Sequence, residues 1–428
     1  MKHKLAHPSL SPAATTPAAE PALDSAASRL PPLLRPRGSN HVGMRQFNER
    51  VVLQAIRQNG SLPKADLARL TGLTAQTIGL ITTRLDEDGL LIRHERVRGR
   101  IGQPSVPLAL NPDGAFSIGI KIGRRNTDWL LVDFTGRVRQ RRTLTYAFPD
   151  AQVLLPALGE NMNTLRDELG ELSPRLVGVG VAAPFLIGGW HRLLGLSEAQ
   201  ANSWNQIDLT AEVQRMTDLP VSFAKDTSAA CVAELVAGCG RDLKSFLYLF
   251  VDTFVGGGLV INSHLHSGLH GNAGAVASVP LYLARQGQSK PEQLLHHASL
   301  WELEQRLNAK GLDPSAAYDD RALQAPFEEE TNAWIGCAAN ALAHCIVSGT
   351  AFLDLDAIVL DGSFCRPLLQ RLIERTRSAL ADYNWEGLWP ATLMAGSIGP
   401  DARALGGALL PLHANFAPDR DLFLKAVY

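Results

Sequence analysis

The sequence predicts an α/β protein in which a small helical unit precedes a much larger, two-lobed part. Three observations indicate this class. Short amphipathic segments separated by glycines occupy most of residues 44–105. From residue 111 onward, apolar strand-like runs alternate with long helical stretches. The chain has 428 residues, of which 46% are hydrophobic, and this is enough material for two or three domains.

The composition argues against several classes of protein. A formal net charge of −1 gives no global attraction to nucleic acid or membrane, so any basic surface must be local. The five cysteines are scattered without a CxxC pair, which is typical of reduced thiols in a cytosolic protein. The amino-terminal stretch lacks the apolar core of a signal peptide, and no uninterrupted apolar run is long enough to span a bilayer. We therefore expect a cytoplasmic protein without a membrane partner.

The organisation of the chain follows from changes in composition. Residues 1–42 are rich in Ala, Pro and Ser, and we expect a disordered tail because such a stretch buries too little apolar surface to offset chain entropy. Residues 43–110 form the small helical unit, and residues 111–428 form the two-lobed part.

The helical unit has the pattern of a winged helix-turn-helix. A first amphipathic helix ends at Gly60, a second is expected to begin with Ser61 as its N-cap, and a third begins with Thr74 as its N-cap. A tight turn at Gly72 joins the last two helices. The basic segment 90–110 predicts two strands around a hairpin, which is a wing. The side chains expected to face inward are Leu67, Leu70, Ile78, Ile81 and Leu85.

This motif predicts contacts with double-stranded DNA. The second helix of such a motif enters the major groove with its amino-terminal end, where Gln76 is suited to adenine and the Ala75 methyl group to thymine. Between Arg45 and Arg100, 10 Lys or Arg stand against 6 Asp or Glu, a local charge of about +4. The alternative is a winged helix used for protein contacts or as a dimerisation arm. The candidate base, phosphate and minor-groove contacts are Thr74, Ala75, Gln76, Thr77, Thr82, Arg84, Arg98, Arg100 and Gln103.

The larger part combines strands and helices in a mixed-sheet pattern. An antiparallel meander opens it and precedes the first helix, and a second set of strands and helices follows. This order predicts two lobes with a cleft between them. The expected strands are 116–123, 128–134, 176–185, 221–226, 245–252, 256–262 and 356–362, and the expected helices are 151–169, 228–238 and 331–353.

Five stretches, in order and at matching spacing, give the chain a family resemblance: "LNPDGAFSIGIKIG", "GVGVAAPF", "KDTSAACVAELVAG", "DTFVGGGLVINSHLHSGLHGNAGA" and "IVLDGS". From Asn48 onward the chain resembles the ROK family, which pairs sugar kinases with sugar-responsive repressors on an actin-like (ribonuclease H-like) ATPase fold. The repressor branch also begins with a winged helix-turn-helix. The resemblance implies a DNA-binding repressor of carbohydrate metabolism or transport genes, which acts as a homodimer or a dimer of dimers.

The phosphate-binding motifs of the kinase branch are altered here. The first motif, Asp-x-Gly-Gly-Thr, has Lys121 at the Asp position and Arg124 and Arg125 at the Gly-Thr pair. An ammonium group cannot position Mg²⁺ as a carboxylate does. The second motif, Gly-Thr-Gly, is Asp-Thr-Phe at 252–254. The resemblance therefore implies no kinase activity and no nucleotide cofactor. The alternative is that Lys121 and Arg124 bind a different anion.

The zinc cluster of the family is also missing. Where relatives carry a Cys-x-Cys-x-x-x-x-Cys cluster, the corresponding segment has no cysteine, and its adjacent His296 and His297 point in different directions. We expect no metal, and we expect Leu300, Trp301 and Leu303 to stabilise this region by apolar packing instead.

The sugar-binding residues of the family are partly retained. Its Asn-Asp pair corresponds to Lys225 and Asp226, where Asp226 accepts hydrogen bonds from hydroxyl groups and Lys225 either pairs with Asp226 or meets an acidic ligand. A Glu and a His of the kinases are replaced by Ala275 and Ser278, which weakens hexose binding. Trp204 is interpreted equally well as a stacking face or as a core residue. The candidate effector-binding residues are Lys225, Asp226, Asn272, Trp204 and Glu302.

We therefore expect a regulator that a small sugar-like effector releases from its operator. Two alternatives stay open. One is a glucokinase-like sugar kinase with a DNA-binding extension, and the other is a regulator that has lost its ligand and works through a protein partner.

Overall fold

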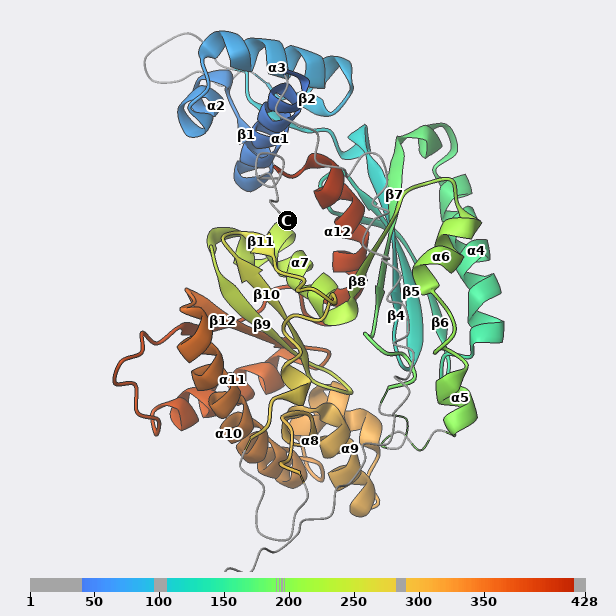
Figure 1. The fold of residues 1–428 in the computed structure, drawn as a ribbon, viewed down its shortest axis with the longest axis vertical. Helices are drawn as coiled ribbons and strands as arrows, with labels where there is room; N and C mark the ends of the chain where they lie inside the picture. The colour runs from blue at the N-terminus through green and yellow to red at the C-terminus, as the bar shows by residue number, and fades with distance from the viewer. Residues whose placement is uncertain are drawn as a thin grey trace, which may run out of the picture.

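The computed structural model describes residues 41–95, 106–189, 191, 193, 195, 197–281 and 290–418. Most of the tail expected at 1–42 lies outside these residues, as do the wing residues Arg98, Arg100 and Gln103. Figure 1 shows a small helical unit at one end of the molecule and two sheet-containing lobes beside and below it.

The small unit consists of short helices and short strands. Its sheet is antiparallel in the order β1-β3-β2, and Thr74 caps the last helix by accepting a hydrogen bond from the Thr77 amide at 3.2 Å. Gly60 and Gly72, at the helix ends, both adopt positive φ, as a glycine C-cap requires. The elements are α1 (His41–Asn59), β1 (Ser61–Leu62), α2 (Lys64–Thr71), α3 (Ala75–Glu87), β2 (Leu91–Arg93) and β3 (Leu108–Leu110).

Two sequence predictions for this unit are wrong. Ser61 does not cap α2, because it lies in β1, where it pairs with Ala109 of β3, and Pro63 holds the N-cap position. Leu70 is 53% exposed, because the eight residues of α2 turn only Leu67 fully into the core. The expected burial of Ile78, Ile81 and Leu85 is confirmed.

The larger part contains two five-stranded sheets with the same connectivity. The orders are β6-β5-β4-β7-β8 in the first lobe and β11-β10-β9-β12-β13 in the second. In each, three antiparallel strands are followed by two parallel ones. The repeated topology confirms the two-lobed prediction. The strands are β4 (Phe116–Ile122), β5 (Asn126–Asp133), β6 (Val138–Thr145), β7 (Leu176–Ala183), β8 (Val221–Lys225), β9 (Phe246–Val251), β10 (Gly256–Ile261), β11 (His264–Leu265), β12 (Ala357–Gly362) and β13 (Thr392–Ala395).

Helices cover the outer faces of both sheets and fill the space between them. The predicted helices correspond to α4, α7 and α10, while α11 and α12 were not predicted. By length and composition α10 is apolar enough to cross a membrane, but half of its most apolar window is buried inside the fold, where it packs on α8 and α11. The helices are α4 (Ala151–Glu168), α5 (Glu198–Asn202), α6 (Leu209–Met216), α7 (Asp226–Ala237), α8 (Leu295–Ala298), α9 (Leu300–Ala309), α10 (Glu328–Leu353), α11 (Arg366–Leu380) and α12 (Ala402–Phe416).

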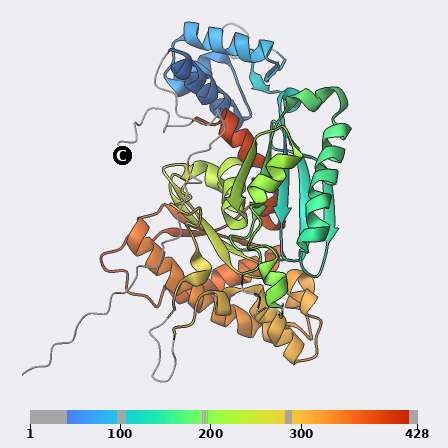
Figure 2. The same cartoon turned by 45° about the vertical axis from the view of Figure 1, so that its right-hand side comes forward.

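Helices α7 and α12 cross between the two sheets and join the lobes (Figure 2). Helix α12 packs on β4 and β7, and α7 packs on β9 and β10. The approach is close: a Cβ on Gly119 would lie 2.3 Å from the Ala408 nitrogen, and one on Gly180 would lie 1.9 Å from the Gly407 oxygen. The glycines of β4 and β7 therefore serve helix packing.

Candidate functional site

A cavity of about 500 Å³ lies between the lobes. The ends of β7 and β8 line one side, and the β9–β10 connection and the loop after β11 line the other. The charged residues at its wall are Arg124, Lys225, Asp226, Asp252 and Arg403. Its position, where strands from two lobes end, is typical of ligand sites in α/β proteins. Three predicted effector contacts, Lys225, Asp226 and Asn272, are brought together here.

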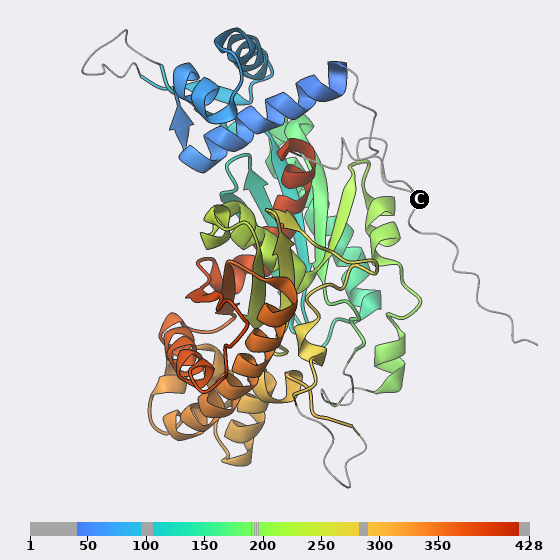
Figure 3. The same cartoon turned by 60° about the vertical axis from the view of Figure 1, so that its left-hand side comes forward.

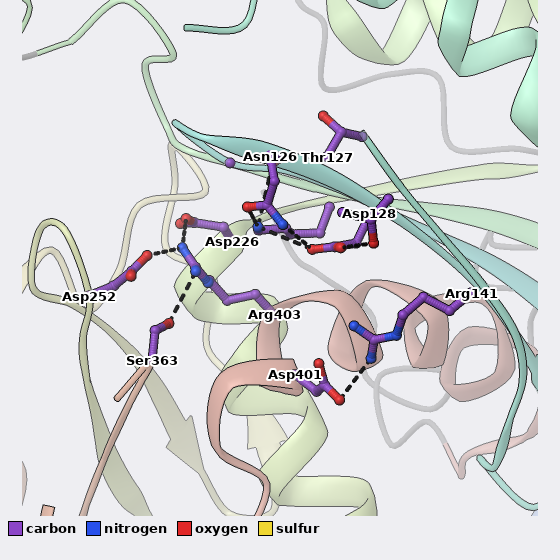
Figure 4. A network of polar contacts seen from close by, with 12 residues as sticks. Asn126, Thr127, Asp128, Arg141, Asp226, Asp252, Ser363, Asp401 and Arg403 are labelled. Carbon is purple, nitrogen blue, oxygen red and sulfur yellow. Dashed lines mark hydrogen bonds and ion pairs between the residues drawn. The ribbon is translucent and has the colours of Figure 1, made fainter. Parts of the chain in front are cut away.

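Arg403 of α12 ties the two lobes together at this cavity (Figure 4). Its guanidinium pairs with Asp252, after β9, and lies 3.7 Å from Asp226, at the start of α7. It also donates a hydrogen bond of 3.2 Å to the Ser363 hydroxyl. Burial by itself would raise the pKa of Asp252, but the opposing charge of Arg403 lowers it overall. One cation thus faces two partly buried carboxylates.

Lys225 has a different set of partners. Its ammonium donates to the Asn272 side-chain oxygen at 3.3 Å and to the Ala273 carbonyl at 2.9 Å. The salt bridge considered between Lys225 and Asp226 is therefore not formed, because Arg403 takes the carboxylate instead. Burial lowers the pKa of Lys225 to about 8, although the nearby Asp226 opposes this.

Trp204 and Glu302 do not line this cavity, although Trp204 lines a second pocket that shares Phe185 and Leu186 with it. Trp204 is 6% exposed and belongs to the core of the first lobe, where its indole donates to the Pro149 carbonyl at 2.7 Å. The core interpretation of this residue therefore holds. Glu302 instead forms an ion pair of 3.0 Å with Arg306, one turn further along α9. Sequence reasoning missed Arg403, because no motif marked the helix that carries it.

The residues that the resemblance aligns with the first phosphate motif of the kinases, Lys121, Arg124 and Arg125, are engaged with other side chains and carbonyl groups of the chain itself. The buried Lys121 ammonium donates to the Asn126 side chain at 2.6 Å and to Asp128 at 3.2 Å. It lies 2.7 Å from where a Cβ on Gly123 would be, so it fills the space beside that glycine. Burial, reinforced by Arg403, lowers the pKa of Lys121 to about 8. Lys121, which the sequence predicted to prevent metal and phosphate binding, is thus held by hydrogen bonds to Asn126 and Asp128.

The two neighbouring arginines are also engaged. Arg124 stacks over the Phe254 ring at 4.7 Å and donates to the Gly189 carbonyl at 3.1 Å. Arg125 reaches the other lobe and pairs with Glu304 at 2.7 Å. Arg124 is therefore packed within this region, whereas Arg125, whose side chain is 52% exposed, bridges the two lobes at its edge.

Within the described residues, no three His, Cys, Asp or Glu side chains are grouped to hold a metal ion. His297 bonds to Glu292 at 2.7 Å. Leu300 and Leu303 are fully buried, and the Trp301 indole donates to the Leu193 carbonyl at 3.1 Å. Apolar packing in this segment is confirmed.

Helix α3 presents an exposed face that begins at its amino-terminal end. Ala75, Gln76 and Thr83 are exposed on it, and Leu80, which was not predicted as a contact, is 67% exposed. Thr82 is wrong as a candidate contact, because it is 2% exposed and its hydroxyl donates to the Ile78 carbonyl at 2.8 Å. Helix geometry places every fourth residue on one face, and this turns Thr82 inward with Ile78.

The other candidates on α3 keep accessible groups. Thr77 is partly exposed, and its hydroxyl lies 2.9 Å from that of Thr74. The side chain of Arg84 is 43% exposed and forms an ion pair of 2.7 Å with Glu49 of α1.

Helix α12 also connects the cavity to the small unit (Figure 3). Arg403 lies in its first turn, and Phe416 at its other end meets the Phe134 ring edge-on with 4.7 Å between centroids. Arg57 of α1 covers the same Phe134 ring and donates to its carbonyl at 2.9 Å. The small unit, α12 and β5 share one hydrophobic cluster, so they form a continuous packed path.

The repeated sheet topology and the cavity between the lobes define an actin-like α/β protein of the type shared by sugar kinases and their relatives. Residues 117–414, more than half of the chain, match the ROK family, and the chain belongs to that family.

Relatives and solved structures agree with this assignment. The xylose repressor of Bacillus subtilis is 23% identical over 240 residues, which cover 56% of this chain and 61% of the repressor. The chain thus matches about three-fifths of the length of that curated relative. A crystal structure of a ROK family transcriptional regulator, a homologue of the E. coli MLC protein, has a TM-score of 0.64 at 18% identity and covers 87% of this chain and 98% of its own.

A kinase shares the same fold. The ROK family glucokinase from Streptomyces griseus, solved with glucose and AMPPNP, has a TM-score of 0.51 at 19% identity and covers 69% of this chain and 99% of its own. At this level of identity the likeness establishes the fold alone.

Proposed function

We propose that this chain is a cytoplasmic DNA-binding transcriptional regulator. Residues 43–110 act as a winged helix-turn-helix that binds a double-stranded operator, and residues 111–428 bind an effector and form a homodimer or a dimer of dimers. The observation that carries the proposal is the exposed face of α3, which starts with Ala75 and Gln76 at a helix terminus held by the Thr74 cap. That geometry suits insertion into the major groove. The names of the repressor relatives support the same assignment.

The contacts that we retain for DNA differ from the first set in two places. Thr82 is withdrawn because it is buried, and Leu80 is added because a large exposed apolar side chain on this face suits a thymine methyl group. Thr74, Ala75, Gln76 and Thr77 remain the candidates for base edges, and Arg84 for phosphate. Arg98, Arg100 and Gln103 remain predictions for the wing.

The effector is proposed to occupy the cavity between the lobes and to release a repressor from carbohydrate genes. A ligand that contacts Asp226, Asp252 or Arg403 competes with the ion pairs that Arg403 forms at the cavity wall. Helix α12 carries Arg403 at one end and packs toward α1 at the other, so a shift of this helix moves the small unit. Helix-turn-helix dimers require half-sites about one DNA turn apart, so a modest rotation weakens operator binding.

The alternative, a sugar kinase with a DNA-binding extension, is favoured only by the shared fold of the kinases. The side chains of Lys121, Arg124 and Arg125 argue against it, because they occupy the phosphate region and are held there by Asp128, Phe254 and Glu304.

The experiment that tests the proposal is selection of DNA by the full-length protein from a pool of fragments of its own genome. We expect enrichment of a few intergenic fragments that contain an inverted repeat. Gel shifts should then give an affinity for the enriched site at least about 1,000-fold higher than for a scrambled site. This ratio is the lower end of the range for sequence-specific DNA-binding proteins. Failure to enrich any sequence over several rounds would contradict the proposal.

A further inference from the structure

The charges that line the cavity do not cancel. Three cations, Arg124, Lys225 and Arg403, face two carboxylates, Asp226 and Asp252. Both carboxylates lie against Arg403. Among the described residues, neither Lys225 nor Arg124 has a carboxylate within ion-pair distance, because their hydrogen bonds go to amide and carbonyl oxygens and Arg124 stacks on a ring. The cavity therefore keeps an excess of positive charge.

Lys225 is the more unusual of the two cations. It is 7% exposed, and a buried ammonium that meets only neutral oxygens is costly unless a counter-charge joins it. Its two partners, Asn272 and Ala273, use two of its three donors, so one N–H is left for another group. Lys225 itself lines the cavity, as does Asn272.

The rest of the wall offers little to a neutral polyol. Phe185, Leu186, Phe254 and Leu295 supply apolar surface. Of the uncharged polar side chains, Thr227 and Thr253 are already hydrogen-bonded to the Gly257 carbonyl and the Tyr318 hydroxyl, which leaves Asn272 and Ser278. A polyhydroxylated ligand would leave many hydroxyl groups without partners against such a wall. Its composition suits a ligand with a charged group at one end and carbon surface at the other.

We propose that the cavity binds an anionic small molecule, whose carboxylate or phosphate group is held by Lys225 with Arg124 as a second cation. The carbon skeleton lies against Phe185, Leu186 and Phe254. This inference rests on the proposed function, since it specifies the chemical class of the effector: an acidic sugar derivative or small organic acid, and not a neutral hexose or pentose.

A pH dependence follows from the state of Lys225. Burial lowers the pKa of Lys225 to about 8 in the free protein, so the ammonium is present below that pH and is lost above it. The ionisable groups facing it are Asp226 and Cys231, and burial keeps the Cys231 thiol protonated by raising its pKa. Anion binding should therefore weaken about tenfold between about pH 7 and about pH 9, following the protonated fraction of Lys225.

The test is isothermal titration of the full chain with a fixed panel. D-gluconate, D-glucuronate, succinate, D-glucose 6-phosphate and inorganic phosphate are the anionic probes, and D-glucose and D-xylose are the neutral ones. We expect at least one anion to bind and both neutral sugars to bind more weakly. A heat of binding with the carboxylate probes or with the phosphate probes shows which of the two anionic groups the cavity binds.

Variants locate the contact. Lys225→Met should weaken the best anion about tenfold or more and remove the pH dependence, since the loss of one charge-assisted hydrogen bond is worth that much. Lys290→Met, at an exposed position, should change binding less than about twofold. Arg124→Gln is the second variant of a proposed contact. Thermal unfolding of all three variants confirms that each protein is folded.

Three outcomes would overturn the inference: preferential binding of a neutral sugar, no binding of any anion in the panel, or anion binding that Lys225→Met leaves unchanged. The DNA selection experiment is independent of all three. A protein that selects an operator and binds D-xylose refutes only the ligand class, whereas one that binds an anion and selects no DNA refutes only the regulatory function.

Discussion

At the residue scale, the guanidinium of Arg403 is the central charge of the cavity between the lobes. Asp226 corresponds to the position that the family resemblance gives to the catalytic base, and Asp252 lies beside the phosphate region. Arg403 lies against both carboxylates and supplies the positive charge that they share. The pairing has a measurable consequence for stability.

Arg403→Met should lower the free energy of unfolding by about 2 kcal/mol or more at neutral pH, because two partly buried carboxylates lose their shared cation. Urea denaturation measures this. Arg403 lowers the pKa of Asp252, so its stabilising effect is present above the ordinary pKa of an aspartate and is lost as the pH falls. The gap between the variant and the wild type should therefore persist at about pH 5 and narrow only as the pH falls below about 4, the ordinary pKa of an aspartate.

The matched control is Arg375→Met, at an exposed position of α11, which should stay within about 0.5 kcal/mol of the wild type. An Arg403→Met protein as stable as the wild type would mean that the pairing contributes nothing.

The exposed face of α3 gives a second prediction at the same scale. Gln76→Ala should cost about 1–3 kcal/mol on the selected operator and should relax the base preference at one position of each half-site. Arg84→Ala should weaken binding to operator and scrambled DNA alike, because phosphate contacts carry no sequence information. Gel-shift titration of both DNAs measures the difference.

Gln305→Ala, exposed on α9, is the control and should leave both affinities unchanged. Equal losses for Gln76→Ala on the two DNAs would contradict a base contact.

At the element scale, the crossing of α7 and α12 determines how the lobes meet. A Cβ at Gly406 would lie 1.7 Å from the Ala229 carbonyl oxygen of α7, a distance that no side chain can adopt. Gly406→Ala should therefore force the two helices apart and cost more than the 1–3 kcal/mol typical of overpacking, about 3 kcal/mol or more.

A second helical glycine provides the comparison. Nothing lies within 4 Å of a Cβ at Gly336 in α10, so Gly336→Ala should raise the free energy of unfolding by about 0.5–1 kcal/mol, because alanine favours a helix more than glycine does. Thermal or urea unfolding of the two variants should shift in opposite directions. A stable Gly406→Ala protein would refute the close crossing.

At the scale of the whole molecule, the chain has a fold shared with kinases but carries Lys121, Arg124 and Arg125 at the positions that the resemblance aligns with a phosphate motif. We expect no release of ADP above background when the protein is incubated with Mg-ATP and the sugar panel, in an assay coupled to NADH oxidation. The physical reason is that Lys121 is held by Asp128 at the place where a carboxylate would position the metal. A ROK glucokinase serves as the positive control, and sugar-dependent turnover would favour the kinase alternative.

The sequence predicted most of the fold and about half of the effector site. Its strands were correct because a buried strand is a short apolar run that local composition reveals. Lys225, Asp226 and Asn272 meet in the cavity because they lie in stretches that resemble family motifs. Thr82 was misassigned, and Trp204 and Glu302 lie outside the cavity lining, because residue type suggests a role but does not say which way a side chain points.

By itself, the sequence determined the family, the order of the elements and the loss of an acidic anchor at position 121, since each of these is a property of residues close together in the chain. Only the tertiary structure decided that Arg403 pairs with Asp226 and Asp252, from which it is separated by more than 150 residues, and that Lys225 donates to the Asn272 and Ala273 oxygens. Ion pairs form where packing brings charges within about 4 Å, and the packing of α12 between two sheets involves the whole chain.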